Sequence, residues 1–361
     1  MMYEQLDDRK LPELPCLNPS HQRIDPVEWT RERQNLLELL ASNVYGLMPD
    51  PPLDLQASYQ LADQPVFDGL GLHSRILLTV PTPAGPFSFP FDLLLPAGSQ
   101  RVPLTVHIAF SPDIPDRYLP AEDILRRGFA IANLYYEDIV PDRPDGLSEG
   151  LAACYDAVNR GRDGCGAIGY WAWAASRILD WLQTHSRVNS ARIAVAGHSR
   201  LGKTALWCAA NDPRFSLVFS NDSGCSGAAI TREKAGERIA DITKTFPYWF
   251  CPAYSDYADK EADMPFDQHF LLASIAPRFL YVASAMDDEW ADPVSELLGC
   301  AAASPVWERF GQAGLITDGS IPTKPVAWHE GSIGYHLRPG GHALKPEDWM
   351  QFLDFRQRHL I

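Results

Sequence analysis

The residues best suited to chemistry start with a serine at a point where a strand turns directly into a helix. The segment 192–207 reads RIAVAGHSRLGKTALW, a short apolar strand followed by a helical pattern. A tight turn of this kind needs Gly197 for close backbone approach, lifts the Ser199 hydroxyl out of the sheet and points backbone N–H groups at it. The pattern predicts a serine nucleophile. It departs from the usual G-x-S-x-G motif at Leu201, so an ordinary strand–turn–helix with an incidental serine stays open.

A candidate acid and a candidate base follow later in the chain, each after a predicted strand. The strand pattern 277–285 leads into an acidic run that contains Asp288, and the strand pattern 333–338 leads into a glycine-rich loop that carries His342. The order serine, acid, histidine is that of an α/β-hydrolase triad. Taken singly, such carboxylates are most often solvated loop charges, and such a histidine is a surface residue. Together they predict a Ser-His-acid site for acyl transfer.

The elements around these residues fit one architecture. Apolar and β-branched patterns predict strands at 74–80, 87–95, 102–110 and 129–136, and helical spacing predicts helices at 26–40, around 171–182 and around 349–353. We expect an α/β-hydrolase fold, with a central, mostly parallel twisted sheet, antiparallel N-terminal strands and helices on both faces. With 361 residues and 46% hydrophobic content, the chain is expected to form a single catalytic domain over 1–361, with 1–52 as an N-terminal helical extension packed on it.

The overall charge and the cysteines exclude several classes of partner. The chain carries 31 basic and 46 acidic residues, a formal net charge of −15, which argues against nucleic acid and anionic membranes. Its seven cysteines have neither disulfide-framework nor zinc spacing, and we expect no metal and no cofactor. The N-terminus has no signal-peptide pattern. We expect a soluble monomer that is cytoplasmic as the sequence stands, and periplasmic or secreted if a signal peptide precedes it.

Several short motifs match one enzyme family. The run from Gly197 to Lys203 fits a G-x-S-R-x-G-K signature, which places the second glycine at 202. Further matching segments are VYGLMP at 44–49, SNDSGCSGAA at 220–229, GE at 236–237, FPYWF at 246–250, PFDQH at 265–269, DEWADP at 288–293 and GH at 341–342. In these motifs the sequence resembles the glucuronoyl esterases, carbohydrate esterase family fifteen, especially the bacterial members.

The resemblance implies a reaction and assigns roles in it. The reaction would be hydrolysis of the C6 ester of glucuronic or 4-O-methyl-glucuronic acid, as in links between glucuronoxylan and lignin alcohols. The substrate would be a small-molecule or oligosaccharide glucuronate ester. Ser199 would attack the carbonyl, His342 would take the proton and return it, and an acid would orient His342. The backbone N–H and, by resemblance, the guanidinium of Arg200 would hold the oxyanion.

The resemblance also bears on the acid and on the sugar contacts. Many family members place a glutamate after the strand that follows the elbow helix, and here that position is Asp222, one methylene shorter. Asp288 occupies the ordinary α/β-hydrolase position, so we favour Asp288 and keep Asp222 as the second choice. Lys203 and Glu237 match residues that hydrogen-bond the sugar, and Trp290 matches one that packs along it. Without the resemblance, Lys203 and Glu237 would be interpreted as solvated charges.

Two other functional classes stay open. The first is a carbohydrate acetyl esterase or another general serine esterase, which Lys203 and Glu237 in the acyl pocket speak against because an acetyl group offers them nothing to bind. The second is a catalytically weak carbohydrate-binding relative in which the imperfect acid has disabled turnover. Labelling of the serine by a fluorophosphonate separates the second class from both kinds of enzyme.

Overall fold

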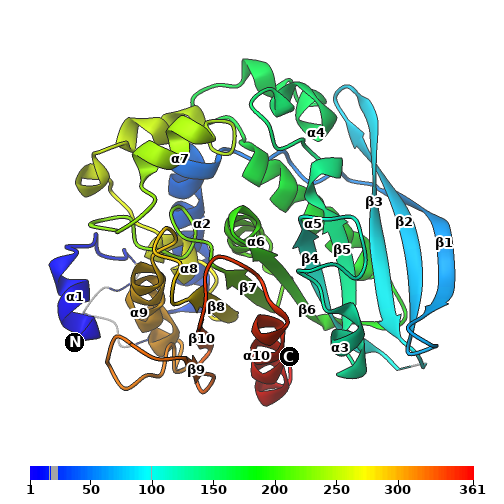
Figure 1. Ribbon diagram of the computed structural model, residues 1–361. Coiled ribbons are helices and arrows are strands. Elements are labelled where there is room, and N and C mark those ends of the chain that lie inside the picture. The colour runs from blue at the N-terminus through cyan, green and yellow to red at the C-terminus, as the bar shows by residue number, and fades with distance from the viewer. Residues whose placement is uncertain (16, 18–22, 99) are drawn as a thin grey trace.

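A ten-stranded sheet forms the centre of the computed structural model, which describes residues 1–15, 17, 23–98 and 100–361 (Figure 1). Its strand order is β1-β2-β3-β5-β4-β6-β7-β8-β10-β9. Neighbours from β5 to β10 run parallel. The N-terminal strands β1, β2 and β3 and the short strand β9 pair antiparallel at the two ends. The mostly parallel sheet with antiparallel N-terminal strands is therefore confirmed.

The strands that carry the candidate site are short and buried, as expected for parallel strands covered on both faces. The ten strands are β1 Gln56–Val66, β2 Gly71–Thr82, β3 Gly85–Pro96, β4 Val102–Ala109, β5 Ala130–Tyr135, β6 Val188–His198, β7 Leu217–Asn221, β8 Phe279–Ala285, β9 Val326–Trp328 and β10 Ile333–Arg338. The C-terminal ends of β6, β7, β8 and β10 meet at one edge because these strands are parallel neighbours. Ser199, Asp222, Asp288 and His342 all follow strands that end there.

Helices cover both faces of the sheet, and each face has its own apolar core. One face is covered by α3 (Ala121–Arg126) and α10 (Pro346–His359). The other is covered by α5 (Ala167–Leu182), α6 (Arg200–Asn211), α8 (His269–Ala273) and α9 (Pro293–Arg309), over the larger core. The shorter helices are α4 (Gly150–Ala153) and α7 (Ile239–Thr245), and 3₁₀ turns span Tyr136–Asp138, Gly146–Ser148, Ala157–Asn159, Pro252–Tyr257 and Glu261–Asp263. Helices on both faces agree with the predicted fold class.

The N-terminal region contributes α1 (Met2–Asp8), α2 (Pro26–Leu40) and a π-helical turn (Ala41–Tyr45). The side chain of Asp25 caps α2 by accepting the first free N–H groups of the helix. The indole of Trp29 donates to the carbonyl of Ala276 at 3.0 Å, and the Tyr45 hydroxyl donates to the carbonyl of Ser226 at 2.7 Å. The region is therefore bound to segments that lie far along the chain.

The limits of several elements agree with the sequence patterns. The helix at 26–40 and the strand at 333–338 have the predicted limits. β6 begins at 188, earlier than its apolar pattern, because Val188 pairs with Val102 beyond a register shift. The three-residue edge strand β9 was not predicted, since so short a segment has no clear periodicity. Among the described residues, no helix is both long enough and apolar enough to cross a membrane.

Candidate active site

The turn between β6 and α6 holds Ser199 by backbone geometry. Ser199 adopts φ 57° and ψ −126°, a conformation that costs energy for a residue with a side chain. Gly197 makes the turn possible, because a Cβ there would lie 2.1 Å from the carbonyl oxygen of Leu201. The Ser199 N–H donates to the carbonyl of Asn221 at the end of β7, at 2.9 Å. The serine is thus fixed at the carboxyl edge of the sheet, as the elbow pattern predicts.

Ser199, His342 and Asp288 form a continuous chain of hydrogen bonds. Nε2 of His342 lies 2.8 Å from Oγ of Ser199, and Nδ1 lies 2.6 Å from Oδ2 of Asp288. Nδ1–H donates to the carboxylate, which leaves Nε2 to accept the serine proton. Burial raises the pKa of Asp288, but the hydrogen bond and charge of His342 outweigh burial and hold that pKa below its usual value. Asp288 is therefore anionic at neutral pH.

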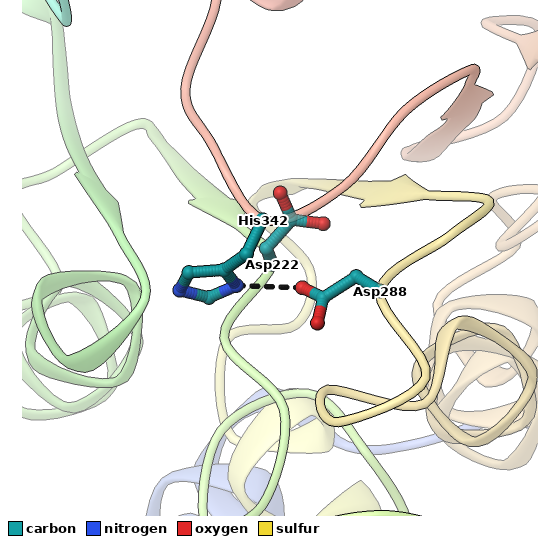
Figure 2. Close-up of side chains that lie close together, drawn as sticks. All are labelled: Asp222, Asp288 and His342. Carbon is teal, nitrogen blue, oxygen red and sulfur yellow. Dashed lines mark hydrogen bonds and ion pairs between the residues drawn. The ribbon is translucent and has the colours of Figure 1, made fainter.

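Asp222, the second candidate acid, lies beside this chain and has other partners. Its Oδ1 accepts from the N–H of Ala285 at 2.8 Å, and its Oδ2 accepts from Nη2 of Arg338 at 3.2 Å. Figure 2 shows the Asp288 carboxylate joined to the imidazole of His342, with Asp222 near the same histidine but not joined to it. Burial and the neighbouring Glu296 raise the pKa of Asp222 well above its usual value. The geometry favours Asp288 as the partner of His342.

The same three side chains are the group that could hold a metal ion in the part of the chain that the structure describes. The possible ligand atoms of Asp222, Asp288 and His342 lie within 4.8 Å of one another. Hydrogen bonds engage both ring nitrogens of His342 and both carboxylate oxygens of Asp222. Hydrogen bonding therefore explains the cluster without a metal.

His198 precedes the serine and packs against His342. The two ring centroids are 4.6 Å apart, and Nδ1 of His198 donates to Oδ1 of Asn221 at 2.6 Å. Burial and, next, the charge of His342 lower the pKa of His198 to about 3. His198 is thus neutral at working pH and does not repel the imidazolium that His342 becomes when it takes a proton.

Arg200 follows the serine, and its guanidinium is anchored. Nη1 forms a close ion pair with Asp142, whose carboxylate also accepts from the Tyr248 hydroxyl at 2.9 Å and from the Trp249 indole at 2.7 Å. The guanidinium carbon lies 4.7 Å from the centre of the Trp249 ring. Because α6 begins at Arg200, its backbone N–H has no acceptor within the helix. A free backbone donor and a fixed cation therefore stand next to Ser199.

A cavity of about 650 Å³ opens at these residues, which is a usual size for a small-ligand site. It is lined by the site residues His198, Ser199, Arg200 and His342, and by Phe110, Ser111, Asp116, Arg117 and Tyr118. A groove of about 620 Å³ between α2, α5 and α6 has none of the candidate catalytic residues in its lining. The cavity at Ser199 could therefore admit an ester to the nucleophile.

The three predicted sugar contacts lie together. Lys203, one turn after Ser199 on α6, has its Nζ 4.0 Å from Oε2 of Glu237, and both side chains are mostly buried. The N–H of Glu237 donates to the carbonyl of Trp290 at 3.0 Å, while the Trp290 side chain is 57% exposed. Lys203 and Glu237 are therefore not the solvated charges that composition alone suggests. Trp290 lies two residues after Asp288, so the loop that carries the acid also carries the aromatic ring.

Sequence reasoning missed two residues that the structure places beside the site. Asp142 lies in an irregular segment after β5, and a carboxylate beyond a strand end was its only signal. Arg338 ends the buried strand β10 just before the loop that carries His342, and only 4% of it is exposed. A charged residue at the end of a mostly apolar strand was a signal that could have drawn attention to Arg338.

Known proteins match both the sequence and this architecture. The family model described as glucuronyl esterase, fungi, matches residues 78–311. Carbohydrate esterase MZ0003, from an unknown prokaryotic organism, is 40% identical over 242 residues, which cover 66% of this chain and 55% of that protein. The 4-O-methyl-glucuronoyl methylesterase 1 of Phanerochaete chrysosporium is 31% identical over 302 residues, which cover 80% of this chain and 59% of that protein. The chain thus spans a little over half the length of these two relatives.

Solved structures extend the match to nearly the whole chain. A glucuronoyl esterase from Solibacter usitatus superimposes with a TM-score of 0.86 at 33% identity, and the match covers 96% of this chain and 97% of that one. A CE15 glucuronoyl esterase from Teredinibacter turnerae gives a TM-score of 0.87 at 30% identity over 99% of this chain and 90% of that one. Taken with the family model, which matches more than half of the residues, these similarities show that the chain belongs to the glucuronyl esterase family.

Proposed function

We propose that this chain is a serine esterase that hydrolyses the C6 ester of glucuronic or 4-O-methyl-glucuronic acid. The observation that carries the proposal is the hydrogen-bond chain from Ser199 through His342 to Asp288, with contacts of 2.8 and 2.6 Å. The name of the Phanerochaete relative, 4-O-methyl-glucuronoyl methylesterase, supports the acyl group. The natural alcohol, as in lignin–glucuronoxylan linkages, belongs to the same proposal.

In the proposed mechanism Ser199 attacks the ester carbonyl carbon while its proton passes to Nε2 of His342. The tetrahedral intermediate then collapses, the bond to the alcohol breaks, and Nε2 returns the proton to the leaving oxygen. Water repeats these steps on the acyl-enzyme and releases the uronic acid. Asp288 holds Nδ1–H of His342 throughout, which fixes the tautomer and stabilises the imidazolium.

The oxyanion is stabilised from the start of α6. The backbone N–H of Arg200 and its anchored guanidinium both lie next to the nucleophile, and donors fixed in advance need no reorganisation when charge develops. Asp142 keeps the guanidinium in place through its ion pair with Nη1. Loss of one such donor typically lowers kcat by about a hundredfold or more.

The acyl side of the site is formed by Lys203, Glu237 and Trp290. A buried ammonium and a buried carboxylate 4.0 Å apart supply a donor and an acceptor for sugar hydroxyls. The exposed ring of Trp290 offers an apolar face to the pyranose. An acetyl group has no hydroxyls for these two side chains to bind, which favours a uronate over an acetate as the acyl group.

The domain organisation and assembly belong to the same proposal. The chain works as a single catalytic domain over 1–361, with 1–52 as an extension tied to the main fold by Trp29 and Tyr45. It acts as a monomer, without nucleic acid or membrane as partner.

The test compares two esters of one alcohol. Benzyl glucuronate and benzyl acetate share a leaving group, so the ratio of their kcat/KM values reports on the acyl side alone. We expect the glucuronate to react at least tenfold faster, since the acetate has no hydroxyls to bind to Lys203 and Glu237. Faster cleavage of the acetate would establish the general esterase, a class to which a structural relative described as a promiscuous CE15 esterase draws attention. Absence of both turnover and fluorophosphonate labelling would establish the binding relative.

A further inference from the structure

Arg338 occupies the centre of the loop that carries His342. It ends β10, is 4% exposed, and is followed by residues 339–345, which belong to no helix or strand. An arginine has five N–H donors in a rigid planar fork. Here every nitrogen of the fork has an acceptor, so the guanidinium has no rotational freedom.

Three of these acceptors are backbone carbonyls of the histidine loop. Nη1 donates to the carbonyls of Pro339 and Gly341 at 3.1 and 3.2 Å, and Nη2 donates to the carbonyl of Ala343 in a short contact. Gly341 and Ala343 are the two neighbours of His342. The loop therefore wraps around the guanidinium, and the backbone is fixed on both sides of the imidazole.

Two buried carboxylates hold the guanidinium itself. Nε donates to both oxygens of Asp348 at 2.9 Å, and Nη2 donates to Oδ2 of Asp222 at 3.2 Å. Asp348 is fully buried and Asp222 is 1% exposed. A buried cation without such partners would be costly. Asp222, which lies next to His342 in Figure 2, thus accepts hydrogen bonds from Arg338 and from the N–H of Ala285.

We propose that Arg338 is the positioning residue for His342, and that Asp222 acts on the reaction through Arg338 and not through the imidazole. The proposal rests on the proposed function only in taking His342 as the general base. Asp222, the second-choice acid, is thereby given a different task, which is to hold the guanidinium around which the histidine loop folds.

The test is Arg338→Lys, which keeps the positive charge and removes the fork. The readouts are the rate at which a fluorophosphonate labels Ser199 and the kcat and KM for benzyl glucuronate. Labelling needs His342 but no sugar recognition. We expect the labelling rate and kcat to fall roughly tenfold to hundredfold, because a displacement of about 1 Å costs that much, while KM stays within about twofold. The final extent of labelling counts the intact sites.

Arg356→Lys is the matched control. Arg356 is also fully buried and donates to the backbone carbonyls of Leu104 and Arg192, but these lie in the N-terminal halves of β4 and β6, away from the sheet edge that carries Ser199. The control loses a buried fork of the same kind and should lose stability without a change in labelling rate. Equal slowing in both variants, or wild-type labelling in Arg338→Lys, would overturn the proposal.

Asp222→Asn tests the second half of the proposal. Alone it should slow labelling about tenfold or less, and combined with Arg338→Lys it should add no more than about twofold, since both act on one element. If the losses in labelling rate of the two single variants multiply in the double variant, Asp222 acts independently of Arg338. If Arg338→Lys does not fold, Asp348→Asn takes its place, and wild-type labelling in that variant contradicts the proposal. If the wild type is labelled normally but does not turn over benzyl glucuronate, the proposed substrate is wrong. The role of Arg338 is then tested by the labelling rates alone.

Discussion

The elbow at 197–203 and the histidine loop at 339–345 hold two parts of one site by different means. The elbow is held by its own backbone, which passes so close to itself at Gly197 that no Cβ fits. The loop has no regular structure and closes around the side chain of Arg338. The elbow requires that residue 197 has no side chain. The histidine loop requires that residue 338 has a guanidinium group. The two regions should therefore fail under different substitutions.

The largest expected effect is the loss of kcat when the hydroxyl of Ser199 is removed from the elbow. Ser199→Ala should lower kcat by about a millionfold, leaving the residual effect of binding and oxyanion stabilisation. Hydrolysis of benzyl glucuronate and thermal unfolding by circular dichroism would be measured together. Wild-type turnover in a folded Ser199→Ala protein would end the serine-hydrolase interpretation.

The next effect separates the two carboxylates beside the histidine. Asp288→Asn removes the acceptor at 2.6 Å from Nδ1 of His342, and kcat should fall roughly ten-thousandfold. Asp222→Asn should cost about tenfold or less, because its contacts go to Arg338 and Ala285. Steady-state kcat on benzyl glucuronate ranks the two variants, and the reverse ranking would make Asp222 the acid.

One added methyl group compares the two regions directly. Gly197→Ala would place a Cβ 2.1 Å from the carbonyl oxygen of Leu201, so the elbow must shift, and we expect kcat to fall about a hundredfold. In the histidine loop a Cβ at Gly341 meets nothing within 4 Å, and Gly341→Ala should cost about threefold or less. Similar losses in kcat from the two variants would remove the distinction between the regions.

The acyl side should show a smaller effect. Benzyl galacturonate differs from benzyl glucuronate at one hydroxyl, and its kcat/KM should be lower by about tenfold to a hundredfold because a buried polar group loses its partner. In Glu237→Gln, which removes the charge beside Lys203, the preference should narrow. If Glu237→Gln keeps the same ratio of kcat/KM for the two esters, Glu237 does not distinguish glucuronate from galacturonate.

The smallest predicted effect is on the free energy of unfolding. It should depend on pH through His198, the elbow residue that packs against His342. The folded-state pKa of His198 is about 3, below the ordinary value near 6.5, so the unfolded chain takes up a proton that the folded chain does not. The free energy of unfolding of the wild type should therefore fall as pH drops below about 6.5. Relative to His198→Gln, we expect a loss of about 2 to 3 kcal/mol by about pH 4.5 in urea titrations. If the free energy of unfolding changes with pH in the same way in the wild type and in His198→Gln, the prediction is wrong.

The two regions also differ in how far sequence could predict them. The elbow is local, and the residues from Gly197 to Lys203 reveal turn, nucleophile and helix in one run. The position of His342 could be predicted because it follows a strand. The hydrogen bonds by which Arg338 holds that loop could not be predicted, because its partners Asp222 and Asp348 lie on other elements of the fold. Asp142 was missed for the same reason, being 58 residues from Arg200 in the chain.

The N-terminal segment has a consequence for the order in which the molecule is made. Trp29 and Tyr45 bond to residues 247 and 181 positions further along the chain, Ala276 and Ser226. At the usual speed of the ribosome, about ten seconds or more separate the emergence of such partners. Throughout that interval Trp29 and Tyr45, both buried in the finished protein, lack these hydrogen-bond partners. The helix α2 and the turn that follows it are thus synthesised well before the segments to which Trp29 and Tyr45 bond, and we expect both contacts to form late in a growing chain.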